Sequence, residues 1–348
     1  MDVLRPRLMW IEGRCYRVNV VDDSVSGSYR WDEEETSGWV TKDEEARGSD
    51  DADIEQTDTG YRTCLEVPSP YFKYLIGKKG ETKKRLESET KTRITIPKSG
   101  EEGEILIVGA ELHGVRSART RIELLLLSVR MRQPFTHFIS IPVARQHIKE
   151  ALFGFRDEVL RRCDGDRGVN FSLFQDADKL HVTVSTLVLL SEAERQCAAH
   201  TLQQCCRQLA DDAKHPLAVT LRGVEYMNDD PSAVDVLYAR VEDASGRLQS
   251  LADGLVSSFA DAGLTQRQRE HEHVKLHVTV MNTIFRRDAE AEVTEGNARE
   301  SFDARRLMQE FVDYEFGELV ITELHISQRY TTASDGYYEA TAVVPLSV

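Results

Sequence analysis

The sequence lacks any long apolar run. Its longest aliphatic cluster, Leu124–Leu127, is bounded by Arg121 and Arg130, whereas a helix that spans a bilayer needs about 20 predominantly apolar residues. The opening residues, MDVLRPRLMW, also lack the apolar segment of a secretory signal. We therefore expect no membrane partner and no export.

Cysteine is scarce as well, and its spacing argues against a disulfide framework. The six cysteines contain no CxxC pair, so we expect reduced thiols in the cytosol or nucleus. Cys197, His200 and Cys205 fall on one expected helix and could offer three ligands to a metal. No fourth ligand stands nearby, and helical cysteine usually fills a core. We therefore favour a structural role and expect no metal or other cofactor.

Positive charge is in the minority, but it is concentrated. The net charge of −15 would argue against a nucleic-acid partner. Residues 32–58, however, carry twelve acidic side chains against two basic ones, and residues 62–98 carry ten basic side chains against four acidic ones. A basic module thus follows an acidic tether, and the local field matters more to a phosphate backbone than the total charge does.

Composition divides the chain into four parts. Residues 1–21 hold two short strand-like runs, too few for a domain, and we expect them to dock onto a partner. Residues 22–58 are acidic and poor in aliphatic side chains, which predicts a disordered linker. Residues 59–132 alternate short strands and helices, and residues 133–348 form a larger α/β pattern after a short tether at 131–134.

Hydrophobic periodicity predicts the elements of both modules. In the first we expect strands at 62–67, 93–96 and 104–108, helices on either side of a turn at 77–80, and a helix at 112–130. In the second we expect strands at 137–143, 178–188, 217–226, 233–241, 274–284, 316–327 and 336–345, and helices at 145–162, 192–212, 246–262 and 303–313. Ser191 and Glu194 form a capping box at the start of the second of these helices.

One hexapeptide occurs twice in the second module. Lys-Leu-His-Val-Thr-Val spans residues 179–184 and again residues 275–280, 96 positions later. Because side chains alternate along a strand, each copy places a histidine and a threonine on one face and three aliphatic residues on the other. The repeat predicts two similar lobes, and we expect the two strands to face each other across a cleft.

Two imidazoles and two hydroxyls in one small space suit phosphodiester chemistry without a metal. A neutral imidazole can take a proton from an attacking water or ribose hydroxyl, and an imidazolium can donate one to the leaving oxygen. The hydroxyls can hydrogen-bond the nonbridging oxygens as their charge grows. A duplication that kept only packing residues is the alternative, but it gives no reason to keep histidine and threonine.

These residues resemble the signature of the two-histidine phosphoesterase superfamily, a pair of His-x-Thr or His-x-Ser strands in a bilobal fold. The resemblance implies two facing antiparallel sheets flanked by helices. It also implies His181 and His277 as acid and base, in an order left open, and Thr183 and Thr279 as phosphate ligands. Members act on 2′,3′-cyclic phosphates, 2′,5′-linked oligonucleotides or RNA 3′ ends.

The first module contains the segment YFKYLIGKKGETKKRLESETKTRITIP, which resembles a KH domain. Glycines at both ends of its loop let the backbone approach phosphates, and the lysines between them neutralise the phosphate charge. The resemblance implies a groove for about four single-stranded nucleotides. The residues that it implies for RNA binding are Ile76, Gly77, Lys78, Lys79, Gly80, Lys83 and Lys84.

Two residues depart from the KH pattern. Lys83 stands where an aliphatic residue is usual and could disturb helix packing. Lys91 stands where glycine is usual, and we expect it to force a different turn. The run Lys83–Arg85 also has a plainer interpretation, as a solvated face of a helix.

The order of the modules, together with segments such as MDVLRPRLMWIEGRCYRVN and LHISQRY, resembles a family of subunits of the activating signal cointegrator 1 complex. The resemblance covers nearly the whole chain. It implies a nuclear protein, without excluding a cytoplasmic pool, that assembles with a helicase subunit and other partners of that complex. It also links the chain to transcriptional coactivation and to repair of alkylated DNA.

We therefore expect an α+β protein in which a small KH-like α/β domain holds single-stranded RNA beside a metal-independent phosphodiesterase site. Arg329 and Tyr330, near the end of a late strand, could contact the phosphate or stack on a base, or belong to the core. Two rival functions remain. One is a scaffold that binds RNA ends and recruits the helicase complex without turnover, and the other is an adaptor that binds only proteins.

Overall fold

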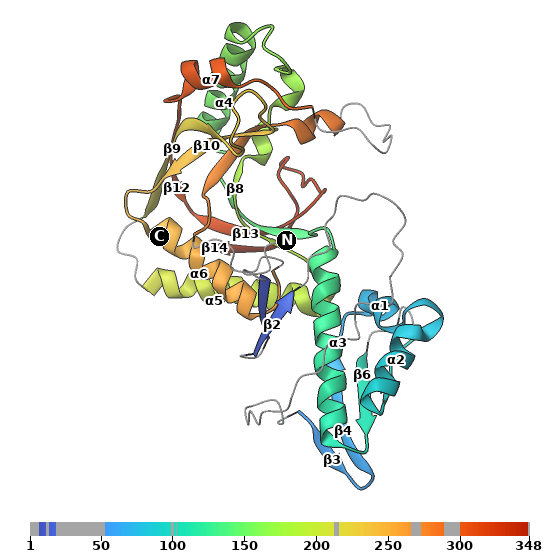
Figure 1. Cartoon of the computed structure of the whole chain (residues 1–348). Coiled ribbons are helices and arrows are strands. Elements are labelled where there is room, and N and C mark those ends of the chain that lie inside the picture. The colour runs from blue at the N-terminus through green and yellow to red at the C-terminus, as the bar shows by residue number, and fades with distance from the viewer. Residues whose placement is uncertain are drawn as a thin grey trace.

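The structure, a computed structural model, describes residues 7–11, 14–18, 53–98, 101, 103–211, 216–265, 273–288 and 300–346 of the 348-residue chain. A small α/β unit is followed by a larger unit built on one sheet, and a long helix leads from the first to the second (Figure 1). The expected α+β class is confirmed. Among the described helices, none is long and apolar enough to cross a membrane.

The expected N-terminal strands form a hairpin of their own. β1 (Arg7–Ile11) pairs with β2 (Arg14–Val18) in antiparallel register, and the two make a separate two-stranded sheet. Most of residues 22–58, the expected linker, lies outside the described residues. Its last residues form β3 (Glu55–Thr57), which pairs with β4 (Gly60–Glu66). The small unit therefore begins at β3, earlier than the apolar pattern of its sequence indicates, because β3 is a polar edge strand.

The small unit has the element order that its sequence predicts. After β4 come α1 (Phe72–Ile76), the short 3₁₀ turn η2 (Lys78–Gly80), α2 (Glu81–Thr90), β5 (Thr92–Thr95), β6 (Glu104–Gly109) and α3 (Leu112–Arg132). The sheet order is β3-β4-β6-β5, and α3 packs on β4 and β6. A separate core closes between helices and sheet, with Leu75, Leu86, Ile105 and Val115 among its buried members.

The large unit contains the helices and strands that the sequence predicts, and several strands begin later than predicted, such as β14 at Ala340 instead of residue 336; one predicted strand is wrong. Its elements are β7 (His137–Pro142), α4 (Gln146–Arg162), η3 (Phe171–Leu173), η4 (Ala177–Lys179), β8 (His181–Leu187), α5 (Glu192–Asp211), β9 (Leu217–Tyr226), β10 (Val236–Glu242), α6 (Arg247–Asp261), β11 (His277–Asn282), η5 (Thr283–Asp288), α7 (Arg305–Phe311), β12 (Glu315–Ile321), β13 (Glu323–Gln328) and β14 (Ala340–Pro345).

The eight strands in the described part of the large unit form one sheet, in the order β12-β9-β10-β11-β8-β7-β13-β14. The two halves of the sheet meet where β11 pairs with β8 in antiparallel register. Helices α4 and α7 pack on β12 and β9, whereas α5 and α6 pack on β14 and β8 (Figure 1). The unit is bilobal as expected, but the two facing sheets that we expected are two halves of one continuous sheet.

The wrong prediction is the strand expected at 316–327, which is two strands. β12 ends at Ile321 and pairs with β9 at one edge of the sheet, while β13 begins at Glu323 and pairs with β7 and β14 in the other half. Both strands bury alternate residues, and exposed Thr322 separates them. The buried positions change phase at the break, from Leu319 and Ile321 to Leu324 and Ile326, because Thr322 and Glu323 are two consecutive polar residues. This change of phase was a signal in the sequence that the prediction of one strand overlooked.

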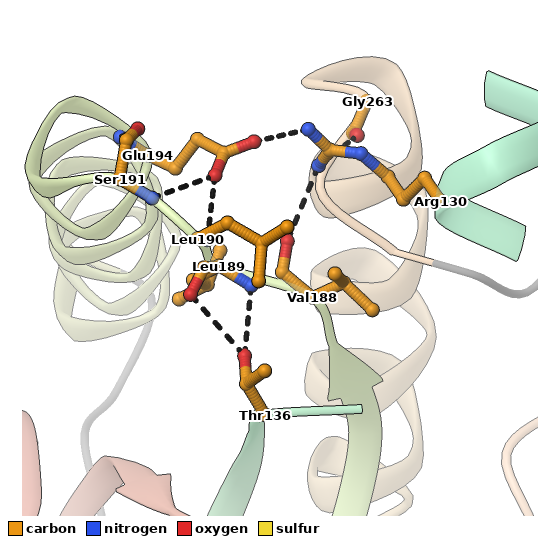
Figure 2. Close-up of polar contacts among 8 residues, drawn as sticks. All are labelled: Arg130, Thr136, Val188, Leu189, Leu190, Ser191, Glu194 and Gly263. Atoms are coloured by element: carbon orange, nitrogen blue, oxygen red, sulfur yellow. Dashed lines mark hydrogen bonds and ion pairs between the residues drawn. The ribbon is translucent and has the colours of Figure 1, made fainter. Parts of the chain in front are cut away.

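A polar contact joins the two units at the end of α3. The Arg130 guanidinium pairs with Glu194 of α5 and donates to the carbonyl oxygens of Val188, at 3.3 Å, and Gly263, at 3.0 Å (Figure 2). The other Glu194 oxygen accepts the backbone N–H of Ser191 at 3.0 Å, and the Ser191 hydroxyl accepts the N–H of Glu194 at 3.2 Å. The predicted capping box is therefore confirmed, and its carboxylate also holds the small unit.

Candidate active site and nucleic-acid interface

The two copies of the hexapeptide lie at the centre of the large sheet. Val182 of β8 is directly opposite Val278 of β11. In both copies the valines are buried, whereas the histidine and the threonine are partly exposed on the other face. The predicted alternation is therefore confirmed. The expectation of two strands facing across a cleft is wrong, because β8 and β11 are hydrogen-bonded neighbours that share one face.

The antiparallel register crosses the two His-x-Thr pairs. Since Val182 and Val278 are opposite, the adjacent residues on either side bring His181 beside Thr279 and His277 beside Thr183. Cβ atoms of directly opposite residues are about 5 Å apart. Each imidazole thus has the hydroxyl of the other copy as its cross-strand neighbour. All four predicted side chains are brought together on one face.

The same backbone contact orients both imidazoles. Nδ1 of His181 lies 2.7 Å from the carbonyl oxygen of Lys179, and Nδ1 of His277 lies 2.7 Å from the carbonyl oxygen of Lys275. A carbonyl oxygen only accepts hydrogen bonds, so Nδ1 carries the hydrogen in both rings. A neutral ring of this tautomer leaves Nε2 free to accept a proton. Both histidines therefore have the same potential acid–base atom.

His181 lies among aromatic side chains. Its ring centre is 5.2 Å from that of Phe138 and 5.4 Å from that of Tyr338, and Lys179 Nζ lies 5.4 Å from the Tyr338 ring centre. Burial lowers the pKa of His181 to about 4, and the nearby imidazole of His277 acts in the same direction, against the hydrogen bond to Lys179. His181 is therefore neutral at pH 7.

The second copy repeats this arrangement with fewer rings. Tyr238 of β10 packs edge-on against His277 with ring centres 5.1 Å apart, and Lys275 Nζ lies 4.8 Å from the Tyr238 ring centre. The Tyr238 hydroxyl donates to Glu225 at 2.7 Å. A lysine and a tyrosine thus accompany each histidine. Sequence reasoning gave the lysines no role although they are repeated, and no sequence signal located either tyrosine.

Arg329 and Tyr330 lie at the end of β13, on the His181 side of the pair. The Arg329 guanidinium contacts the rings of Phe135 and Tyr330, and Phe135 in turn packs against Phe138, which contacts His181. The alternative that Tyr330 belongs to the core is wrong, since its side chain is 84% exposed. Contact with a substrate stays a prediction.

In the small unit, the glycine loop has the backbone that its sequence predicts. Gly77 has φ +71°, and a Cβ there would lie 2.2 Å from Thr82 Oγ1, so a side chain is excluded. Gly80 has φ +80° with open space around it. Lys78 and Lys79 between them are exposed, and Ile76 before them is half-buried. The loop therefore presents two cations and accessible backbone to solvent.

The two departures from the KH pattern leave the fold intact. Lys83 is half-buried on α2 and lies 3.9 Å from Glu87, one turn on, while neighbouring Lys84 is exposed. Lys91 has φ +51°, the left-handed conformation that glycine favours at a helix end. Our expectation of a different turn is therefore wrong, because lysine adopts the same backbone at a small cost in strain.

The described residues contain no group of three or more histidine, cysteine or acidic side chains that could hold a metal ion. Cys197 is exposed and Cys205 half-buried on α5, whereas Cys206 is buried in the core. The core role expected for these cysteines is therefore wrong for Cys197, whereas Cys205 packs against the core.

Comparisons with known proteins agree with both modules. A family model described as "KH domain" matches residues 62–124, and one described as "AKAP7 2′5′ RNA ligase-like domain" matches residues 135–346. Solved structures of Escherichia coli LigT complexed with 3′-AMP and of a phosphoesterase are 19% and 17% identical, each over 62% of this chain and 100% of that chain, both with a TM-score of 0.37.

A relative also matches the entire chain. The mouse protein "Activating signal cointegrator 1 complex subunit 1" is 43% identical over 361 aligned residues, which cover 100% of both chains. The chain belongs to the activating signal cointegrator 1 complex subunit 1 family, and it joins a KH domain to a two-histidine phosphoesterase domain of the 2′,5′ RNA ligase-like kind.

Proposed function

We propose that the large domain is a metal-independent phosphodiesterase that acts on RNA, with cyclic phosphates, 2′,5′ linkages and 3′-end phosphodiesters as candidate substrates. The observation that carries the proposal is the shared face of β8 and β11, where His181 and His277 have the same tautomer and crossed threonine neighbours. A duplication that kept only packing residues would require neither the shared tautomer nor the crossed threonine neighbours. Two acid–base groups around one phosphate can supply both proton transfers of a displacement at phosphorus without a metal.

The electrostatics favour His181 as the base. Its lowered pKa keeps Nε2 unprotonated at pH 7, ready to take the proton of the attacking water or 2′-hydroxyl. The new P–O bond forms as the bond to the leaving oxygen breaks, and protonated His277 donates its Nε2 hydrogen to that oxygen. Thr183 and Thr279 donate hydrogen bonds to the nonbridging oxygens as charge grows there. Exchange of protons with water restores both imidazoles.

A substrate panel tests this proposal. Purified full-length protein is incubated in EDTA with a 2′,3′-cyclic mononucleotide, a 2′,5′-linked oligoadenylate and oligoribonucleotides with different 3′ ends, and the products are separated by chromatography. We expect turnover of at least one substrate. His277→Ala should lower it by about 10²- to 10⁴-fold. The matched control is His113→Ala, since His113 is exposed on α3, and it should retain activity.

Absence of turnover with every substrate would contradict the enzymatic proposal. If the protein nevertheless bound RNA 3′ ends, and His277→Ala weakened that binding, the scaffold that recruits the helicase complex would be the better account. A requirement for a divalent metal would also overturn the proposed chemistry, because no step above uses one.

The KH domain supplies the RNA-binding part of the proposal. Gly77–Gly80 and the exposed lysines of the loop bind the backbone of a single strand, with Ile76, Lys83 and Lys84 beside them. The contact of Arg130 with Glu194 joins this domain to the large domain. RNA held by the loop is thereby retained on the same molecule as the histidine pair, which raises its effective concentration there.

A loop substitution separates RNA binding from pure protein docking. Gly80→Asp adds a negative charge and a strained side chain at φ +80°, and we expect it to weaken binding of single-stranded RNA about 10-fold or more. Gly246→Asp is the matched control, because Gly246 has φ +69° and equally open space at the start of α6 in the large domain. Unchanged RNA affinity in the Gly80 variant would support the protein-only adaptor.

The proposal extends to place and partners. We propose a nuclear protein that assembles with a helicase and other subunits, and that takes part in coactivation and in repair of alkylated DNA. The full-length match to a subunit of the activating signal cointegrator 1 complex supports the assembly into a complex. Residues 1–21 are the proposed docking segment. Among the described residues β1 and β2 pair with each other and with no further strand, so we propose that a partner strand adds to one edge of this hairpin. Deletion of residues 1–21 should abolish co-purification with the complex and leave the folded domains intact.

A further inference from the structure

Tyr330 combines an exposed ring with a backbone conformation that tyrosine rarely adopts. Its side chain is 84% exposed and its φ is +64°. A bulky residue with positive φ is an outlier that persists only where its surroundings hold it. Here the Thr331 hydroxyl donates to the Gln328 carbonyl oxygen at 2.9 Å and accepts the Glu339 N–H at 3.2 Å. The turn is fixed, yet the ring that it presents buries almost no surface.

A cation lies against this ring. The guanidinium carbon of Arg329 is 4.3 Å from the Tyr330 ring centre and 4.0 Å from that of Phe135. The Arg329 backbone N–H donates to Thr136 at 2.9 Å, and its Nη1 donates to the Phe135 carbonyl oxygen at 3.4 Å. Two rings and a planar cation therefore form one assembly, which we call the Arg329 stack. Flat π surfaces and a guanidinium are the groups on which nucleobases stack.

Among the ring contacts of the described residues, the Arg329 stack leads to His181. Phe135 and Phe138 have ring centres 6.4 Å apart, and Phe138 is 5.2 Å from His181. On the other side, the ring neighbour of His277 is Tyr238, which is buried and cannot stack on a base. The repeated hexapeptide alone would make the site nearly symmetric. The Arg329 stack makes the His181 side of the site different from the His277 side.

We infer that the Arg329 stack binds the base of the nucleotide next to the phosphodiester held between the histidines. The position of that phosphodiester rests on the proposed function, whereas stacking on the exposed ring does not. An oligonucleotide therefore reaches both the histidine pair and the stack, and a mononucleotide reaches only the pair. The ligand class is single-stranded RNA with at least one nucleotide beyond the reacting phosphate, and the bases can be of any kind because every base has a π face.

The test compares Tyr330→Ala with Phe171→Ala in the full-length protein. Phe171 is a matched control, since it is 64% exposed and has an arginine, Arg156, 5.1 Å from its ring centre, but it has no ring contact with either histidine among the described residues. Affinity is measured for a single-stranded octaribonucleotide and for a 3′-mononucleotide, with the recovered RNA checked for integrity. We expect Tyr330→Ala to weaken octanucleotide binding about 10- to 100-fold and leave mononucleotide binding unchanged.

A fluorescent variant locates the contact. The three tryptophans, Trp10, Trp31 and Trp39, are replaced by phenylalanine, and Tyr330→Trp is introduced into that chain. Octanucleotide should quench the new fluorescence at saturation, whereas Phe171→Trp in the same chain should not respond. Equal losses in both alanine variants, or no quenching at residue 330, would overturn the inference. Neither measurement needs turnover. Base stacking on Tyr330 can therefore be confirmed or rejected even if the protein has no phosphodiesterase activity.

Discussion

The two copies of Lys-Leu-His-Val-Thr-Val fold alike but have different surroundings. Both tie histidine Nδ1 to the carbonyl oxygen of the lysine two residues earlier, at the same 2.7 Å. His181, however, packs against Phe138 and Tyr338, whereas His277 has Tyr238. The local sequence sets the tautomer, and the tertiary environment lowers the pKa of His181. Under the proposed function, two identical segments take opposite roles in one acid–base pair.

Removing either imidazole gives the largest effect. His181→Ala and His277→Ala should each lower turnover of the preferred substrate by about 10²- to 10⁴-fold. Because the two act in one step, the double variant should be little worse than the poorer single variant. Single-turnover rates of the three variants measure this. Losses that multiply would mean that the two copies act independently, and the comparison above would fail.

Acid should destabilise the fold through His181. Its folded pKa of about 4 lies below the ordinary 6.5, so between these values the unfolded state binds more protons, and stability falls as pH falls. The loss should approach about 3 kcal/mol by pH 4. Urea unfolding of the parent and of His181→Asn at pH 7 and pH 4 gives the difference. A parent that loses no more stability than the variant would show that His181 is not held neutral.

The crossed register predicts unequal effects of the two threonines on one histidine. Thr183→Val and Thr279→Val should each lower the rate about 100-fold by removing a donor to the phosphate. In the free protein, however, Thr279→Val should shift the imidazole NMR signals of His181 more than Thr183→Val does, since Thr279 is its cross-strand neighbour. The reverse pattern would contradict the register.

The smallest expected effect concerns the aromatic surroundings. Tyr338→Ala admits water beside His181 and should raise its pKa by about 1. Tyr238→Ala, the matched change beside His277, should leave the pKa of His181 unchanged, which an NMR titration can follow. If both variants moved the pKa of His181 equally, the difference between the copies would not lie in their rings.

Sequence alone predicted the parts of the site that depend on local pattern. Alternation in the hexapeptide placed histidine and threonine on one face, and the pair Ser191 and Glu194 marked a helix start. It did not predict that β8 and β11 are neighbours, because strand pairing depends on the whole sheet. It also missed Tyr238 and Tyr338, which other segments bring to the site.

In the KH loop, too, the sequence predicted one part of the backbone correctly and another part wrongly. Its glycines predicted a close-approach turn, and the structure has positive φ at both. Lys91 was expected to change the turn, yet it adopts φ +51°. A left-handed backbone costs a non-glycine residue about 1–2 kcal/mol, which the surrounding packing can offset. The packed elements on either side of residue 91 therefore determine its backbone conformation more than the identity of the residue does.

The central claim is that one face holds two coupled imidazoles of the same tautomer. Imidazole ¹⁵N NMR of the full-length protein from pH 3 to pH 9 tests it most directly. The account predicts hydrogen on Nδ1 of both His181 and His277 at pH 7, an apparent pKa near 4 for His181, and a response of each ring to the titration of the other. Two independent titrations near the ordinary value, or a neutral form of either ring with its hydrogen on Nε2, would contradict it.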